Sequence, residues 1–197
     1  MTLNEKFRTM MAPRGFLSRQ GKTMKQPLAT ALGVGILGGI ATALFLQVGT
    51  LLIWAAFVAW ASYFAVGGDN AAIKLNIGSN TFGVFVAWLV GLLILANPFA
   101  GLATPIWAGG LVLISVVLYI MASKIPLFSS VPAVTLGYAT TFAYLGQTPD
   151  AFTYKAMLSP SFSNALVVVT VSMFIGTLFA TASAKLSTLF AAEEPAS

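Results

Sequence analysis

The chain contains no cysteine and no histidine. These two absences exclude disulfides, thiolate nucleophiles, histidine-based catalytic triads and nearly every zinc, copper or haem site, because each needs a thiolate or an imidazole. We therefore expect no catalytic residue, no cofactor and no metal site, and we expect that the protein is not an enzyme.

Charged residues are also scarce. Only 8% of the 197 residues are charged and 58% are apolar, whereas a soluble domain carries about a quarter charged residues. The charges gather in residues 1–25 and after residue 184, which leaves five in between: Asp69, Lys74, Lys124, Asp150 and Lys155. This distribution excludes the soluble class and predicts an integral membrane protein whose partner is the lipid bilayer.

The net charge of +5 comes from the N-terminal segment. Nucleic-acid binding needs an exposed polar surface that carries the basic residues, so we expect no nucleic-acid partner and interpret the basic segment as a determinant of membrane orientation. We expect a disordered, basic cytoplasmic tail over 1–25, one transmembrane helical domain over 26–186 and a short C-terminal tail over 187–197. No repeat of 20–50 residues is apparent.

Four charge-free runs, 26–68, 75–123, 125–149 and 156–184, delimit the hydrophobic segments. A bilayer core of about 30 Å needs roughly 20 apolar helical residues for each span. The first run divides at Gly49-Thr50 and the second at Asn97-Pro98, both of which favour turns. We predict an all-α, polytopic helical bundle with six hydrophobic segments: 28–48, 51–66, 82–96, 102–121, 131–145 and 165–184.

The fifth segment allows two topologies, because Pro126 and Pro132 interrupt it and short apolar stretches re-enter the membrane as readily as they span it. The protein has either six spans or five spans and a re-entrant half-helix. In both cases the positive-inside rule places the N-terminus in the cytoplasm. We favour six spans, with a cytoplasmic C-terminus.

Glycines in the first segment match the residue pattern of a nucleotide-binding motif but not its structural context. Gly33, Gly35 and Gly38 give G-x-G-x-x-G, but the preceding strand and the following acidic residue of that motif are missing. Small residues recur at every fourth position, namely Ala31, Gly35, Gly39 and Ala43. This spacing permits close helix contact, so we predict that Gly35 and Gly39 are packing residues, and we expect a homo-oligomer.

Two groups of uncharged polar residues are candidates for contact with a small neutral solute. The candidate entrance is the polar stretch before the third segment: Asp69, Asn70, Asn76 and Asn80. The alternative role of these residues is helix capping and turn formation. Ionisable residues are absent from the middle of the predicted spans, which disfavours proton-driven transport.

The candidate solute path consists of one amide and five hydroxyl residues: Asn97, Ser129, Ser130, Thr135, Thr140 and Thr141. Hydroxyls both donate and accept hydrogen bonds, as a neutral polar solute requires. Backbone groups freed by the prolines would each cost several kcal/mol in hydrocarbon, which favours a wet cavity. The alternative is that the hydroxyls bond to carbonyls of their own helix and the prolines simply start it.

Two stretches resemble a known family. Leu51-Leu52-Ile53-Trp54-Ala55-Ala56-Phe57, continuing to Ser62-Tyr63-Phe64-Ala65, resembles the second hydrophobic segment of the YcdZ-like bacterial inner-membrane family, whose function is unknown. Val131-Pro132-Ala133, followed by Gly137 and Thr141-Phe142-Ala143, resembles a later block of that family, with Ala133 where its members have Gly. The resemblance covers roughly residues 24–184 and implies a multi-pass protein of the bacterial inner membrane.

A second likeness is to urea transporters. Asn97-Pro98-Phe99-Ala100-Gly101-Leu102 is similar to their Asn-Pro-x-Ser/Thr-Gly-Leu stretch, although it lies here between the third and fourth segments. This likeness implies that two or more copies form one pathway. Together, these features predict a passive channel or facilitator for a small neutral polar solute such as urea, an amide or ammonia. The alternative is a non-transporting accessory or structural subunit of a membrane complex.

Overall fold

The computed structural model describes residues 26–99 and 102–192. The elements are α2 (Gln26–Val48), α3 (Ile53–Ala65), α4 (Asn70–Ala96), α5 (Thr104–Met121), the 3-10 turns η1 (Ala122–Lys124) and η2 (Pro126–Phe128), α6 (Val131–Gln147), α7 (Tyr154–Met157) and α8 (Ala165–Ala192). All regular structure in the described residues is helical, which confirms the all-α prediction. The predicted disordered tail, 1–25, lies outside the described residues.

Four helices are long and apolar enough to cross a membrane: α2, α4, α5 and α8. The helix α3 has 13 residues and α6 has 17, so at 1.5 Å per residue they rise only about 20 Å and 26 Å. The multi-pass helical architecture is thus as predicted, while the count of six spans stays a prediction.

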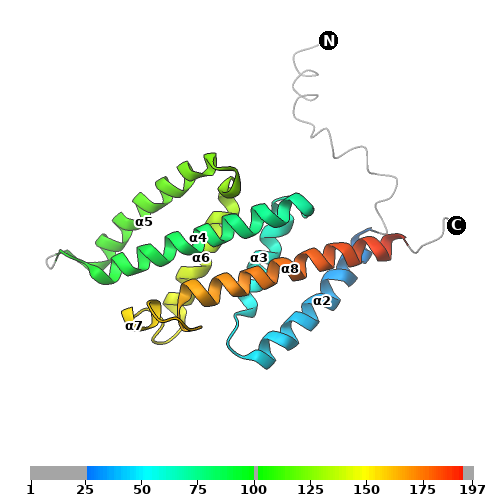
Figure 1. The fold of residues 1–197 in the computed structure, drawn as a ribbon, viewed down its shortest axis with the longest axis horizontal. Helices are drawn as coiled ribbons and strands as arrows, with labels where there is room; N and C mark the ends of the chain where they lie inside the picture. The colour runs from blue at the N-terminus through cyan, green and yellow to red at the C-terminus, as the bar shows by residue number, and fades with distance from the viewer. Residues whose placement is uncertain (1–25, 100–101, 193–197) are drawn as a thin grey trace, which may run out of the picture.

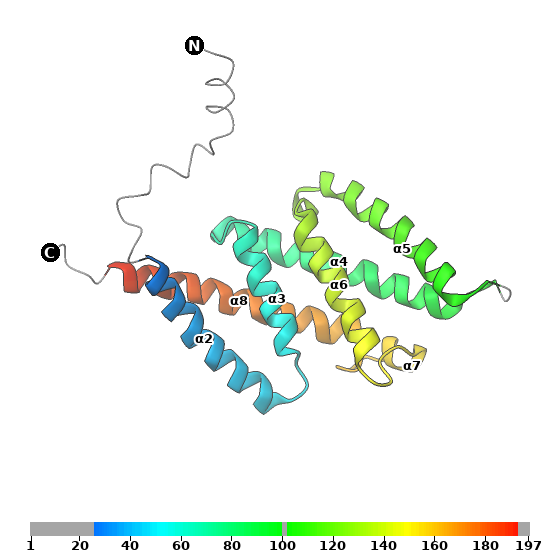
Figure 2. The ribbon, with the colours of Figure 1, turned by 180° about the vertical axis from the view of Figure 1, so that it is seen from behind.

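The helices form two layers with a helix on each flank. The long helices α4 and α8 run antiparallel in one layer (Figure 1), and α3 and α6 lie behind them (Figure 2). The helix α3 packs mainly against α8, and α6 packs mainly against α4. On the flanks, α2 packs against α8 and α5 against α4.

This arrangement is an internal duplication. A half turn about the line of sight in Figure 1 carries α2, α3 and α4 onto the places of α5, α6 and α8. The contacts between helices show the same symmetry, because each short helix packs on the long helix of the other half: α3 packs on α8, and α6 packs on α4. The chain therefore consists of two three-helix repeats, each about half the length of the chain. Each repeat is longer than the range of 20–50 residues in which the sequence shows no repeat.

Matching residues support the duplication along all three helices. The same amino acids recur in α3 and α6 at the pairs Ala55/Ala133, Ala61/Ala139, Phe64/Phe142 and Ala65/Ala143. In α4 and α8 they recur at Ala72/Ala165, Ser79/Ser172, Gly83/Gly176 and Ala87/Ala180, and all eight of these residues are buried. On the flanks, the buried residues Ala41 and Phe45 of α2 correspond to Ser115 and Tyr119 of α5.

Glycines set the distance between the two layers. A Cβ added at Gly83 would collide with the carbonyl oxygen of Val134, and one added at Gly137 with the carbonyl oxygen of Asn80. In the other half, a Cβ at Gly176 would collide with the carbonyl oxygen of Ala56. The short and long helices thus meet backbone to backbone, as small residues permit in membrane bundles.

The predicted packing glycines of α2 lie elsewhere. Gly33 is the glycine of α2 that contacts α8, at Ser183 and Ser187. A Cβ added at Gly35 or Gly39 meets no other part of the described chain within 4 Å, and both residues are exposed. Their packing against another copy of the chain stays a prediction.

Two boundaries differ from the sequence prediction. The third segment begins at Asn70 and not at 82, because its polar side chains bond to other helices and do not form a loop. The last helix continues to Ala192, so residues 187–192 of the predicted tail are helical. The fifth segment is one unbroken helix, with Pro132 in its first turn, where a missing N–H is harmless.

The start of α2 and the end of α8 lie together, since Gly33 faces Ser187. We therefore predict that both termini are on the same side of the membrane. In a bacterial inner membrane, alkaline phosphatase fused after Ser197 should be inactive, and the same enzyme fused after Asp150, between α6 and α8, should be active. The reverse pattern of phosphatase activity would contradict the six-span topology.

The glycine contacts predict that Gly83→Val strongly lowers the melting temperature in detergent. The added side chain meets the Val134 carbonyl, and overpacking of this kind costs about 1–3 kcal/mol or more.

Two variants serve as controls. Gly109→Val on α5 should leave the melting temperature nearly unchanged, because no described atom lies within 4 Å of its new Cβ. Gly39→Ile should leave the fold of one chain intact and shift only the oligomeric state measured by size exclusion. A Gly83→Val variant as stable as Gly109→Val would refute the contact.

Candidate functional site

Four fully buried polar side chains meet where α3 and α4 of the first repeat pack against α8 of the second. They are Ser62 on α3, Asn76 and Asn80 on α4, and Thr177 on α8, each at most 2% exposed. Asn76 and Asn80 are one helical turn apart, so both point from the same face of α4. We refer to these four residues as the amide cluster.

Each hydrogen bond of the amide cluster has a defined donor and acceptor. Asn76 Nδ2 donates to the carbonyl oxygen of Ala59 at 3.0 Å and to Thr177 Oγ1 at 2.9 Å. Because a carbonyl oxygen can only accept, the Asn76 amide is oriented with its nitrogen toward Ala59. Asn76 Oδ1 therefore faces Asn80 Nδ2, which donates to it at 2.8 Å. Thr177 Oγ1 in turn donates to the Met173 carbonyl oxygen at 3.0 Å.

This chain of bonds leaves one acceptor unused. Asn80 Nδ2 also donates to Ser62 Oγ at 3.4 Å, so both of its hydrogens are engaged. The carbonyl oxygen Asn80 Oδ1 is buried without a hydrogen-bond partner among the described residues. Buried polar atoms are nearly always paired, so this oxygen is the atom of the cluster at which a hydrogen-bond donor would bind.

The α4/α8 contact between the two repeats has one polar half and one apolar half. The duplication pairs Asn76 with Val169 and Thr177 with Val84, and these two valines belong to one hydrophobic cluster of the core. The same relation pairs Asn80, midway between Asn76 and Val84 on α4, with Met173, midway between Val169 and Thr177 on α8, so these two residues lie close to the twofold axis. One half of the α4/α8 contact is thus held by an amide and a hydroxyl, and the other half by two valines.

The predicted entrance residues divide into two sets. Asp69 is the N-cap of α4, where its carboxylate accepts from Ala72 N at 2.8 Å, and Asn70 is exposed beside it. Asn76 and Asn80 lie inside the bundle on α4, so their predicted placement before the third segment is wrong, while solute contact by them stays a prediction. Their polar side chains are compatible with a buried helix because each amide bonds to a neighbouring helix or to the other amide.

The predicted path residues do not form one group. Leu127, just before Ser129 and Ser130, contacts Gly78, whereas Asn97 follows α4 about 28 Å farther along its axis at 1.5 Å per residue. Asn97 shapes the turn after α4, because its Nδ2 donates to the Leu102 carbonyl oxygen at 3.3 Å.

Most hydroxyls of the fifth segment bond to nearby backbone. Ser129, Thr135 and Thr141 each donate to a carbonyl three or four residues earlier, at 2.8–2.9 Å, and Ser130 caps α6 by accepting from Ala133 N. Thr140 and Thr141 are buried, and Thr135 is exposed. These bonds match the alternative that the sequence left open, and solute contact by these residues stays a prediction.

Sequence reasoning missed Ser62 and Thr177. The signal that could have found Thr177 is the shared pattern Ser-x-x-x-Gly-x-x-x-Ala, at Ser79-Gly83-Ala87 and again at Ser172-Gly176-Ala180. Aligning the two repeats on this pattern places Thr177 directly after the second glycine, in the part of α8 that packs against α3.

These features define a class: a helical membrane protein made of two matching three-helix repeats around a buried polar centre. The protein family described as "Protein of unknown function (DUF1097)" matches residues 31–188, and the chain belongs to this family. No curated protein and no solved structure matches the chain. The prediction of an uncharacterised family is confirmed, while the YcdZ-like and urea-transporter likenesses stay predictions.

The pairing of Asn76 with Thr177 predicts a non-additive double mutant. Asn76→Val and Thr177→Val should each destabilise the protein by about 1 kcal/mol, because each leaves a buried polar group without a partner. The double variant copies the Val169/Val84 pair in the other half of the α4/α8 contact, so its free energy of unfolding should lie well above the value expected for additive losses.

The control replaces Thr181, one turn after Thr177, whose hydroxyl bonds only to the Thr177 carbonyl oxygen. Asn76→Val combined with Thr181→Val should be additive within about 0.5 kcal/mol. Equal coupling in the two cycles, measured by unfolding in detergent, would show that the Asn76–Thr177 bond contributes nothing specific.

Proposed function

We propose that the protein is a facilitator that moves a small neutral polar solute across the membrane, with the amide cluster as its solute-binding site. The observation that carries this proposal is the buried Asn80 Oδ1, which has no hydrogen-bond partner among residues 26–99 and 102–192 and lies beside the twofold axis of a duplicated bundle. Solutes with N–H donors, such as urea, simple amides and ammonia, have the group that this oxygen lacks.

The duplication supports transport through its geometry. The twofold axis is perpendicular to α4 and α8 (Figure 1), so it lies in the membrane plane when these helices cross the bilayer. If all six helices of the two repeats span the membrane, namely α2, α3, α4, α5, α6 and α8, each repeat has three spans. The two repeats then have opposite orientations in the membrane. Inverted repeats are common among secondary transporters, whose substrate sites lie near the midplane at the repeat interface.

The chemistry of the cluster supports a neutral solute. All four side chains are uncharged, and the described parts of α3, α4, α6 and α8 place no ionisable side chain in the amide cluster. A charged solute would meet no countercharge there, and desolvation would make its entry costly. An amide solute can replace hydrogen bonds one for one, because the cluster offers both donors and acceptors.

The alternative function is that of a non-transporting subunit of a membrane complex. The observation that favours it is the exposed stripe of small residues on α2, which contacts no other part of the described chain at Gly35 and Gly39. A partner helix could approach this stripe closely. The two functions differ in whether the purified protein alone moves any solute.

The decisive experiment measures solute permeability of liposomes that contain the purified protein. Stopped-flow light scattering should show faster entry of urea, acetamide or ammonia than in protein-free liposomes. Asn80→Leu should reduce this flux at least tenfold, because leucine keeps the branching at Cγ and has no acceptor. Met173→Leu, at the matching position of the second repeat, should keep most of the flux.

Three outcomes would count against the proposal. Liposomes with protein that are no more permeable than empty ones to all three solutes would favour the subunit function. Equal loss of flux in Asn80→Leu and Met173→Leu would remove the role of the Asn80 oxygen. Selective permeability that Asn80→Leu leaves unchanged would place the solute path elsewhere in the bundle.

A further inference from the structure

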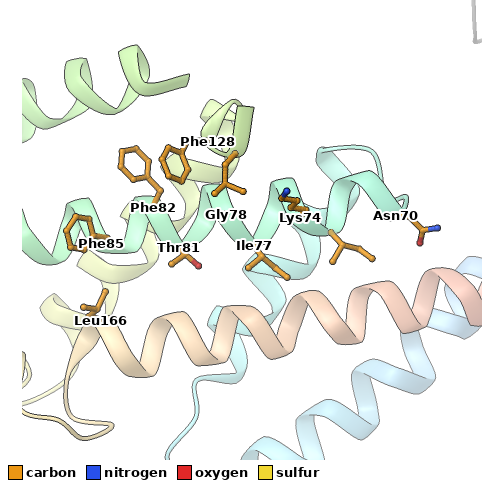
Figure 3. A pocket seen from close by; sticks show the side chains of 11 residues that line it. Asn70, Lys74, Ile77, Gly78, Thr81, Phe82, Phe85, Phe128 and Leu166 are labelled. Carbon is orange, nitrogen blue, oxygen red and sulfur yellow. The ribbon is translucent and has the colours of Figure 1, made fainter. Parts of the chain in front are cut away.

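A long apolar groove runs along the outer surface of α4. It has a volume of about 950 Å³ and lies between α4, the η2 turn and the beginning of α8. Figure 3 shows Ile77, Thr81 and Phe85 along α4, with Leu166 of α8 on one side. On the other side Phe82 stacks on Phe128 with ring centres 4.3 Å apart. These two stacked rings form an aromatic wall of the groove, the Phe82–Phe128 wall.

One end of the groove is polar. Lys74 and Asn70 lie there, in the first turns of α4 (Figure 3), and Lys74 is the one ionisable side chain among the described residues that line the groove. A second groove of about 440 Å³ meets the first at Lys74 and Leu127 and adds the hydroxyl of Ser129. Two grooves therefore converge on a single exposed lysine.

The dimensions fit one leaflet of a bilayer. Lys74 and Phe85 are separated by eleven residues of helix, which corresponds to about 16 Å at 1.5 Å per residue. Half of a hydrocarbon core of about 30 Å is about 15 Å. With Lys74 at the level of the headgroups, the groove ends near the middle of the membrane, where an acyl chain also ends.

We propose that this groove is a binding site for an anionic phospholipid. The phosphate lies against the Lys74 ammonium and within reach of Asn70 and Ser129, and one acyl chain lies along Ile77 and Phe85 against the Phe82–Phe128 wall. Basic pockets between transmembrane helices bind anionic headgroups by the same chemistry. The duplication supports a specific site, because Lys74 corresponds to Val167 and the second repeat lacks the cation.

A lipid fits better than the other occupants of an apolar groove. The groove follows a helix that is apolar enough to span the membrane, so lipid chains reach its full length. A second copy of the chain would have to cover the Lys74 ammonium with a countercharge, yet the only acids among the described residues are Asp69 and Asp150. Asp69 is engaged as the cap of α4, and Asp150 follows α6, beyond its far end.

The test is native mass spectrometry of the full chain in detergent, titrated with phosphatidylglycerol and with phosphatidylcholine of the same acyl chains. The wild type should retain phosphatidylglycerol preferentially. Lys74→Ala should weaken this binding about fivefold, the effect of removing one lysine near the headgroups, and Lys74→Arg should preserve it. Lys185→Ala removes the same charge from an exposed position of α8 and should leave binding unchanged.

The groove itself is tested with Thr81→Trp, which fills the space between Ile77 and Phe85. This variant keeps Lys74 and should still lose phosphatidylglycerol binding, while its melting temperature without lipid stays close to that of the wild type. Equal retention of the two lipids, or equal losses in Lys74→Ala and Lys185→Ala, would overturn the proposal. A dimer that Thr81→Trp dissociates would assign the groove to a second copy.

Discussion

Close approach of helix backbones is the constraint on which the rest of this structure depends. At Gly83, Gly137 and Gly176 one helix contacts the carbonyl oxygens of another with no side chain between them. In a lipid environment helices associate by such packing and by hydrogen bonds, because lipid is as apolar as the helix surfaces. The close contacts hold α6 against α4 and α3 against α8, and between these helices Asn76 of α4 bonds to Ala59 of α3 and Thr177 of α8.

The two symmetry-related halves of the α4/α8 contact are packed with different chemistry. At the related positions of the α4/α8 contact, Asn76 bonds Thr177 in one half and Val84 joins Val169 in the other. An apolar contact has no unpaired atoms, whereas the amide cluster retains one at Asn80 Oδ1. A buried acceptor without a partner costs stability. The related position of the second repeat holds the apolar Met173, so Asn80 is kept at a cost that solute binding would explain.

Much of the helical architecture could be predicted from the sequence, and much of the site could not. Turn residues such as Asn97-Pro98 and the first-turn position of Pro132 gave the helix limits closely. The start of α4 was misplaced because Asn76 and Asn80 are polar, and a linear sequence does not show which polar residues find partners on another helix. Asn80 was predicted as an entrance residue before the third segment, although it lies inside the bundle. Its partner Ser62 was not a candidate, since a lone serine in an apolar run does not by itself indicate a buried polar site.

The sequence by itself determined that the chain is helical, apolar along most of its length, poor in charge and without thiol or imidazole chemistry, because these properties depend on composition and local periodicity. Only the tertiary structure decided which glycines touch: Gly33 and Gly83 contact other helices, and Gly35 and Gly39 do not. It also decided that the two halves match and that four distant polar residues meet. The physical reason is that contacts between helices depend on rotation and crossing, which small residues permit at many positions and which the packing of all the helices together selects.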